Sequence, residues 1–331
     1  MSAARDWLEP RRRVLQLAFG MIWLLDAALQ FQSYMFTPAF PHQVIAPVGP
    51  GNPGWIADPV RWSAHLAATH VVALNAAFAM TQLLIALGLF TRATVRLALV
   101  GSVLWALGVW WMGEGLGGLL AGAQSPVMGA PGAAVLYVLI SALLWPGSDP
   151  LDAPVGAVAA PGRPRALAAR LAWLALWSGF ALESLQAANR SPSALHDAVA
   201  GMAAGEPRWL QAVDHGAAAA LAHRGTEASI ALAVAFGLVA LSVLGNTAVR
   251  RVGLTAAIVL AVVIWVVGQN FGEIATGSAT DPNTGPLLVL LAAVYWPIVR
   301  RTAAPDAAAH PAAVDRQPML GRTTEQARCA V

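Results

Sequence analysis

The side chains most able to carry chemistry are four carboxylates within or at the ends of apolar runs: Asp26, Glu183, Glu114 and Glu273. A charged group at the centre of a bilayer costs about 3 kcal/mol on insertion scales, so each position demands a functional or structural reason. With a shift of 154 residues, Glu183 falls three positions after Asp26, and both therefore project from the same helix face. We predict that the carboxylates, one pair in each half, gather toward the extracytoplasmic side, where a polar pocket in each bundle relays protons.

Uncharged polar and aromatic residues at similar depth extend this predicted site. The candidates for cofactor binding are Gln30, Gln32, Gln186, Trp110 and Asn270. A structural alternative stays open, in which the carboxylates satisfy one another and the N–H groups of nearby Gly-rich loops. We predict no metal site, because the sequence lacks CxxC and HExxH patterns and its histidines lack the spacing of metal ligands.

The elements that must position these residues are apolar helices. Of the 331 residues, 57% are hydrophobic and only 11% are charged, whereas about a quarter are charged in soluble domains. A helix needs roughly 20 apolar residues to cross the hydrocarbon core, and several runs approach or exceed that length. We therefore predict an all-α polytopic membrane protein with eight transmembrane helices, at 12–33, 64–90, 94–113, 131–146, 167–188, 227–245, 252–271 and 286–299.

Arginine placement predicts the orientation of these helices. The sequence contains no Lys, and most arginines fall in short clusters on alternate loops, as the positive-inside rule expects of cytoplasmic loops. We expect both termini in the cytoplasm, an uncleaved first helix and no nucleic acid partner. The predicted parts are a first membrane unit (1–147), a cytoplasmic Pro-rich linker (148–166), a second membrane unit (167–301) and a disordered cytoplasmic tail (302–331).

An internal repeat relates the two units. A shift of 154 residues aligns similar residues in the same order: Trp23 with Trp177, Gln32 with Gln186, His42 with His196, Gly51 with Gly205, Pro53 with Pro207 and Trp55 with Trp209. Farther along, Glu114 matches Glu273 at a shift of 159, after small insertions. Because each unit has an even number of helices, we predict two tandem four-helix bundles in parallel orientation, related by an axis along the membrane normal.

Each four-helix unit resembles the DoxX-like family of small bacterial membrane proteins, which includes the DoxD subunit of thiosulfate:quinone oxidoreductase. The resemblance lies in the basic N-terminus that leads into Gly20–Asp26, in the order of four helices, and in the loop that contains Asp281–Pro286. It implies a location in the bacterial cytoplasmic membrane and a redox accessory role linked to quinone. The fusion of two units departs from the usual single-unit chain, and no catalytic residue is carried over from the family.

Three hypotheses of function follow. The first is a redox accessory subunit that uses quinone, in which Asp26 and Glu183, or Glu114 and Glu273, take up protons and a partner protein supplies electrons. The second is an assembly or scaffold protein that engages another membrane or periplasmic protein. The third is a carrier for a small solute or cation, which the duplicated halves and the carboxylates favour. Membrane lipid is a partner in all three hypotheses.

Overall fold

The computed structural model describes residues 3–122, 124–146 and 164–297, which form helices and turns without a β-strand. Five of the described helices are long and apolar enough to cross a membrane: α3 (Val71–Phe90), α4 (Val95–Met112), α6 (Pro164–Ser184), α9 (Gly225–Ser242) and α10 (Thr247–Val267). Bulky apolar side chains such as Leu97 and Val252 are exposed on them. The chain is therefore an α-helical integral membrane protein.

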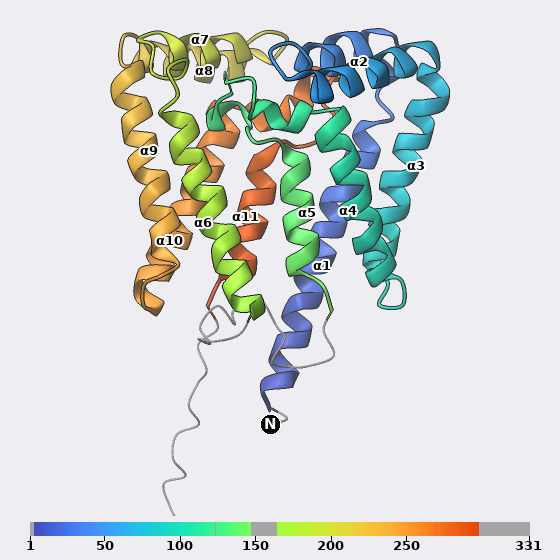
Figure 1. Cartoon of the computed structure of the whole chain (residues 1–331), viewed down its shortest axis with the longest axis vertical. Coiled ribbons are helices and arrows are strands. Elements are labelled where there is room, and N and C mark those ends of the chain that lie inside the picture. The colour runs from blue at the N-terminus through green and yellow to red at the C-terminus, as the bar shows by residue number, and fades with distance from the viewer. Residues whose placement is uncertain (1–2, 123, 147–163, 298–331) are drawn as a thin grey trace, which may run out of the picture. The chain divides into compact units, whose positions relative to one another are not determined.

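The remaining helices differ in length and direction. The helix α1 (Ala3–Leu29) runs along the bundle, and two short apolar helices, α5 (Ala133–Leu143) and α11 (Thr284–Tyr295), lie at its centre (Figure 1). Three further helices lie across one end of the bundle, and we refer to them as the lid: α2 (Gly54–Thr69), α7 (Ala194–Met202) and α8 (Arg208–Leu221).

The predicted helix at 64–90 is two helices in the structure. The helix α2 ends at Thr69, and His70 takes non-helical backbone angles (φ −128°, ψ 38°) before α3 begins at Val71. The chain turns a corner here, because α2 belongs to the lid and α3 runs along the bundle (Figure 1). Hydropathy missed this corner because both sides of it are apolar.

The predicted helices at 131–146 and 286–299 are also shorter than expected. The structure forms 11 residues of helix in α5 and 12 in α11. At 1.5 Å per residue these helices are roughly 16–18 Å long, about half of the hydrocarbon thickness. The remaining depth is occupied by the loops that precede them, 113–132 and 268–283, which lie between the lid and the bundle (Figure 1).

Each of these two loops is tied to the preceding long helix by a tryptophan. The indole N–H of Trp110 donates to the carbonyl of Pro131 (2.8 Å), and that of Trp265 donates to the carbonyl of Pro282 (2.7 Å). Non-helical backbone at membrane depth is tolerated only where protein or a polar cavity covers it. The two indoles thus satisfy carbonyls just before α5 and α11 begin.

The two halves of the chain use the same packing partners. The helix α1 packs on α3 and α4 on α5 in the first half, while α6 packs on α9 and α10 on α11 in the second. Local geometry also matches, since Gly51 (φ +85°) and Gly205 (φ +81°) share a left-handed conformation. Pro53 and Pro207 immediately precede α2 and α8 in the same extended conformation.

Each half also places a loop against the other half. The amide of Gln32 donates to the carbonyl of Ala279 in the second-half loop (3.1 Å), and the amide of Asn189 donates to the carbonyl of Gln124 in the first-half loop (2.7 Å). The 3-10 turn Pro126–Met128 contacts α6 and α10. The halves are therefore joined by a reciprocal exchange of loops at the lid end.

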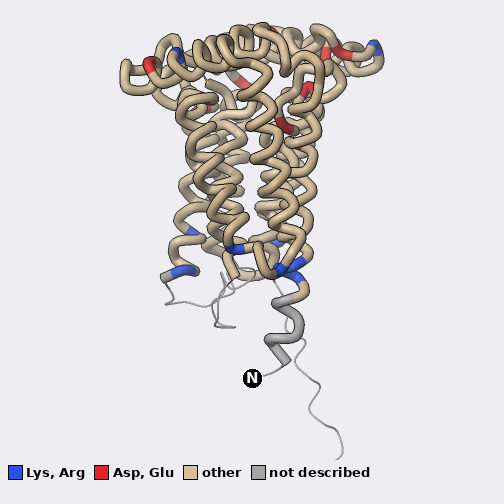
Figure 2. The backbone as a smooth tube through the Cα atoms, turned by 90° about the vertical axis from the view of Figure 1, so that its right-hand side faces the viewer, with Lys and Arg blue, Asp and Glu red and all other residues tan. Residues whose placement is uncertain are grey.

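Charge is distributed unevenly along the bundle. Figure 2 shows most arginines at the end opposite the lid and a few at the lid itself, whereas the acidic residues lie toward the lid. Arg11 donates to the carbonyl of Ala293 (2.7 Å) and Arg13 to those of Leu89 (2.8 Å) and Phe90, near the C-terminal ends of α11 and α3. These contacts satisfy carbonyls that a helix end leaves free. The predicted linker lies outside the described residues up to residue 163, and the predicted tail lies wholly outside them.

The close packing of the first-half loop gives a stability prediction. Gly117 has φ +64°, and a Cβ placed there would lie 1.8 Å from the carbonyl oxygen of Pro131, whereas Gly122 (φ +73°) has open space around its Cβ position. Both Gly→Ala changes carry the cost of a left-handed backbone, but only Gly117→Ala adds a steric clash. We expect Gly117→Ala to destabilise the protein by about 2 kcal/mol more than Gly122→Ala in thermal unfolding in detergent. Equal losses would show that the loop is free to move away from Pro131.

Candidate functional site

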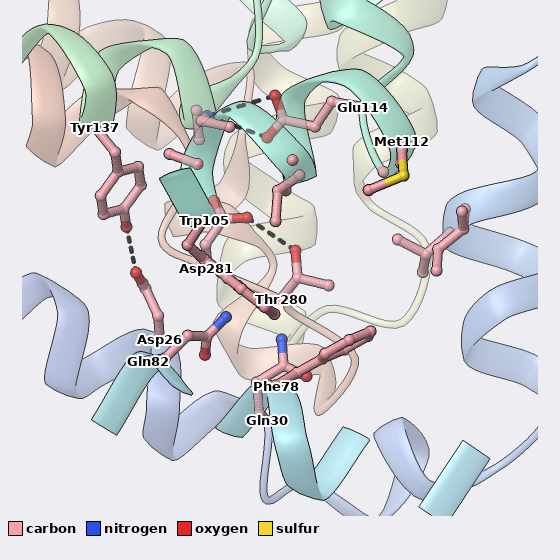
Figure 3. A pocket seen from close by; sticks show the side chains of 18 of the residues that line it. Asp26, Gln30, Phe78, Gln82, Trp105, Met112, Glu114, Tyr137, Thr280 and Asp281 are labelled. Carbon is pink, nitrogen blue, oxygen red and sulfur yellow. Dashed lines mark hydrogen bonds between the residues drawn. The ribbon is translucent and has the colours of Figure 1, made fainter. Parts of the chain in front are cut away.

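A cavity of about 430 Å³ lies in the first half, beneath the lid. Its apolar wall comes from α3, α4 and the turn before α2, and includes Phe40, Ile45, Phe78, Trp105, Val109 and Met112. Its polar lining comes from α1, α2, α3, α5 and two loops, namely Asp26, Gln30, Ser63, Gln82, Glu114, Tyr137, Thr280 and Asp281; Figure 3 labels all of these except Ser63. Cavities with apolar walls and a few convergent polar groups are the usual form of small-molecule sites.

Asp26 and Tyr137 form the deepest polar contact of the cavity. The Tyr137 hydroxyl donates to Oδ2 of Asp26, and the two side chains point toward one another across the space between α1 and α5 (Figure 3). Asp26 is only 2% exposed, and its Oδ1 has no hydrogen-bond partner among the described residues. The ring of Tyr137 also packs on Trp23 with centroids 4.5 Å apart, which fixes the direction of the hydroxyl.

Glu114 joins the end of α4 to the start of α5. It lies two residues after the last residue of α4, and its carboxylate accepts from the backbone N–H of Ala134 (3.1 Å) in the first turn of α5. A negative charge is stabilised at a helix N-terminus. Gly132 makes this approach possible, because a Cβ at that position would lie 2.0 Å from Oε2 of Glu114.

The surroundings of Glu114 favour its protonated form. Burial, reinforced by the charge of Asp281, raises the pKa of Glu114 to about 8, although the hydrogen bond from Ala134 acts in the opposite direction. A carboxyl group with this pKa exchanges its proton near neutral pH. It therefore has the property that a general acid or base of this cavity requires.

Asp281 reaches the cavity from the second half of the chain. Its Oδ1 accepts from the backbone N–H of Asn283 (2.7 Å) and its Oδ2 from the hydroxyl of Thr280 (2.9 Å). Burial raises the pKa of Asp281, and these two hydrogen bonds oppose the rise. The loop crossing between the halves thus places a third carboxyl group with Asp26 and Glu114 (Figure 3).

Two buried amides complete the polar lining. Gln30 (4% exposed) and Gln82 (7% exposed) each have an amide oxygen without a hydrogen-bond partner among the described residues. Asn75 holds the end of α1 beside them by donating to the backbone carbonyl of Gln30 (2.8 Å). An amide can present either its N–H₂ or its oxygen to a ligand after a flip.

The predicted site residues divide into three groups. Asp26, Glu114 and Gln30 line the cavity together. Three others hold the backbone: Gln32 donates to the carbonyls of Leu29 and Ala279, Trp110 to that of Pro131, and Asn270 to that of Met202. These contacts fit the structural alternative for those residues.

Glu183, Gln186 and Glu273 do not line this cavity. Glu183 is buried in α6 and Gln186 is half-buried just beyond it, whereas Glu273 is exposed in a left-handed turn (φ +57°). Among the described residues, no group of three His, Cys, Asp or Glu side chains could hold a metal ion.

The second half places different side chains at the positions that match Asp26 and Glu114. Phe180 follows Asp26 by 154 residues and packs with Trp177 and Phe236 (centroids 5.3 and 5.5 Å from it). Gln269, rather than Glu273, is the equivalent of Glu114, because each lies two residues after its long helix and contacts the start of the next one. The expected pairing of carboxylates between the halves is therefore absent at these positions.

Five polar residues that line the cavity were not predicted: Ser63, Gln82, Tyr137, Thr280 and Asp281. Gln82 could have been found as a polar residue in the middle of an apolar run. Tyr137 gives no such signal, because a tyrosine in an apolar helix commonly packs in the core. Thr280 and Asp281 reach the cavity only through the crossing of the loops, which no local pattern reveals.

Comparison with known proteins identifies no relative of this chain. Neither the family models, nor the curated proteins, nor the solved structures include one that matches it.

The protonation of Glu114 predicts a pH-dependent stability. Its pKa is about 8 in the folded protein and near 4.5 when unfolded, so the folded state binds an extra proton between these values. Stability therefore falls as pH rises through this window. Glu114→Gln keeps an acceptor for Ala134 but cannot titrate, and we expect a smaller drop in melting temperature between about pH 5.5 and about pH 8.5 than in the wild type. Asp58→Asn, an exposed change on α2, is the control and should follow the wild type; an unchanged drop in Glu114→Gln would contradict the assignment.

Proposed function

We propose that this integral membrane protein is of DoxX-like type and binds a quinone-type ligand in the cavity of its first half, as an accessory subunit of a membrane redox system. The observation that carries the proposal is the cavity itself. It combines apolar walls with a hydrogen-bonded Asp26–Tyr137 pair and a carboxyl group, Glu114, whose pKa is about 8.

The chemistry of the lining suits a flat, apolar ring with oxygen substituents. Phe78 and Trp105, whose rings meet edge to face at 5.3 Å, offer an aromatic wall for such a ring. The N–H₂ groups of Gln30 and Gln82 can donate to carbonyl oxygens, and carboxylates can accept from hydroxyls. The residues present therefore fit both the oxidised and the reduced form of this ligand class.

Proton exchange is the part of the reaction that this chain's own residues would perform. The ligand, when bound, supplies the two-electron redox chemistry, and a partner protein supplies or removes the electrons. Tyr137 orients Asp26, and Glu114 holds a proton at Oε1 or Oε2 within the same cavity. These groups would let protons follow the electrons without passage through the apolar wall.

We further propose that the chain is a tandem duplication with eight membrane-spanning segments, two of which combine a loop with a short helix, and with both termini in the cytoplasm of a bacterium. The matched turns at Gly51 and Gly205 and the matched helix starts after Pro53 and Pro207 support a duplication. The arginines at the end opposite the lid support the orientation (Figure 2). In this arrangement the cavity lies at the extracytoplasmic side.

A second candidate is a carrier for a small organic cation. It is favoured by one observation, namely that none of the described residues lining the cavity is Lys, Arg or His, although three are acidic. A third, a scaffold that engages a partner, is favoured by the exposed Trp55 and Trp209 at the starts of lid helices. The two readings predict cation uptake by vesicles and stable co-purification of a partner, respectively.

Mass spectrometry of small molecules released from the mildly purified protein tests the proposed function. We expect a near-stoichiometric quinone in the wild type and at least a tenfold loss in Asp26→Asn and Tyr137→Phe, because each removes one side of the buried hydrogen bond. The control is Glu227→Gln, an exposed change at the start of α9, which should retain the quinone. Lipid alone in the wild type, or equal quinone in all four proteins, would overturn the proposal.

A further inference from the structure

The charge of the cavity is one-sided. Asp26, Glu114 and Asp281 come from three separate elements and line the same space, and no basic side chain among the described residues lines it with them. Oδ1 of Asp26 has no hydrogen-bond partner among the described residues, and Asp26 is 98% buried. A donor that enters the cavity, such as a ligand N–H or O–H group, would satisfy an acceptor atom in this position.

We propose that Asp281 is a specificity-determining residue of the cavity and that, together with Asp26 and Glu114, it selects ligands that carry an amine over neutral or anionic ligands of the same shape. This inference goes beyond the proposed function because it concerns the charge of the ligand and not its redox class. A neutral ring still binds through its contacts with the apolar wall. The carboxyl groups determine how the affinity changes with the charge of the ligand.

Asp281 is held in place independently of any ligand. The carbonyl of Pro282, the next residue, accepts from the indole of Trp265 (2.7 Å), and the carbonyl of Ala279 accepts from Gln32 (3.1 Å). The bonds from Asn283 and Thr280 fix the carboxylate itself. Because the protein already orients this carboxylate, ligand binding involves little free-energy cost for ordering its side chain.

The charge of Asp281 affects the other ionisable groups that line the cavity. Its charge acts on Asp26, Glu114 and Tyr137, which belong to α1, the loop after α4 and α5. An ammonium group between the three carboxyl groups would stabilise their ionised forms, while a bound carboxylate would disfavour them further. The apolar wall around the site keeps the local dielectric constant low, so the preference is larger than at a water-exposed surface.

Three probes of equal size test the inference: hexylamine, hexanol and hexanoate. Binding to the full-length protein in lipid nanodiscs is followed by the fluorescence of the cavity tryptophans, with empty nanodiscs subtracted. We expect hexylamine to bind about tenfold more tightly than hexanol, and hexanoate to bind most weakly. Equal affinity for the three probes, or tightest binding of hexanoate, would overturn the proposal.

The variants Asp281→Asn and Asp281→Glu assign the effect to one residue. Asn keeps an acceptor for the N–H of Asn283 but removes the charge, so the ratio of hexylamine to hexanol affinity should fall about threefold, with the rest of the preference left to Asp26 and Glu114. Glu restores the charge and should restore most of the ratio, which a merely structural role for Asp281 would not require. Asp58→Asn, which changes an exposed acid, is the control and should leave the ratio unchanged.

The pH dependence gives a second readout that needs no variant. Glu114 loses its proton as pH rises through about 8, whereas a primary alkylamine stays protonated, so the preference for hexylamine should grow between about pH 7 and about pH 9. A preference that is flat in this interval, or a ratio unchanged in Asp281→Asn, would refute the role given to these carboxyl groups. Quinone content is measured separately in the same preparations. The absence of quinone from the wild-type protein would overturn the proposed function but would leave the order of the three probe affinities intact.

Discussion

The structure depends on satisfying the backbone of two loops that replace half of a transmembrane helix. The helices α5 and α11 are too short to extend through the whole bundle. The rest of the depth is filled by non-helical chain, whose N–H and C=O groups need hydrogen-bond partners. Membrane lipid offers no partner for such groups. Trp110 and Trp265 provide one for each loop, and Glu114 and Gln269 bind the first turns of the helices that follow. A lid over the loops then keeps them from the lipid.

The same arrangement gives the chain a cavity in its first half. Gly132 lets Glu114 approach α5, and the second-half loop passes over the cavity because Gln32 holds it against the end of α1. In the second half an aromatic group takes the place of the acid, where Phe180 packs with Trp177 and Phe236. The two halves therefore carry different chemistry at this matched position.

Sequence patterns predicted the membrane class and part of the site. Apolar content and length identified the five long helices, because the free energy of burying a helix in lipid depends mainly on composition. Asp26, Gln30 and Glu114 were identifiable as polar residues in or beside apolar runs, where their cost demands a reason. The corner at His70 was not, since a change of backbone direction leaves hydropathy unchanged. Asp281 was not identifiable, because it reaches the cavity only when the second-half loop packs against the first half, and such tertiary contacts leave no local sequence pattern.

The presence of both loops in one polypeptide has a consequence for the cavity. In a symmetric homodimer of a single unit, both copies carry the same substitutions, so an acid supplied by one subunit to its partner's cavity would appear twice. A single chain is free of that constraint. It can keep Asp281 for the cavity of the other half while an alanine, Ala130, stands directly before Pro131 in the first-half loop, where Asp281 stands directly before Pro282. The two loops can therefore differ within one chain, so the acid that the second-half loop brings to the cavity occurs once.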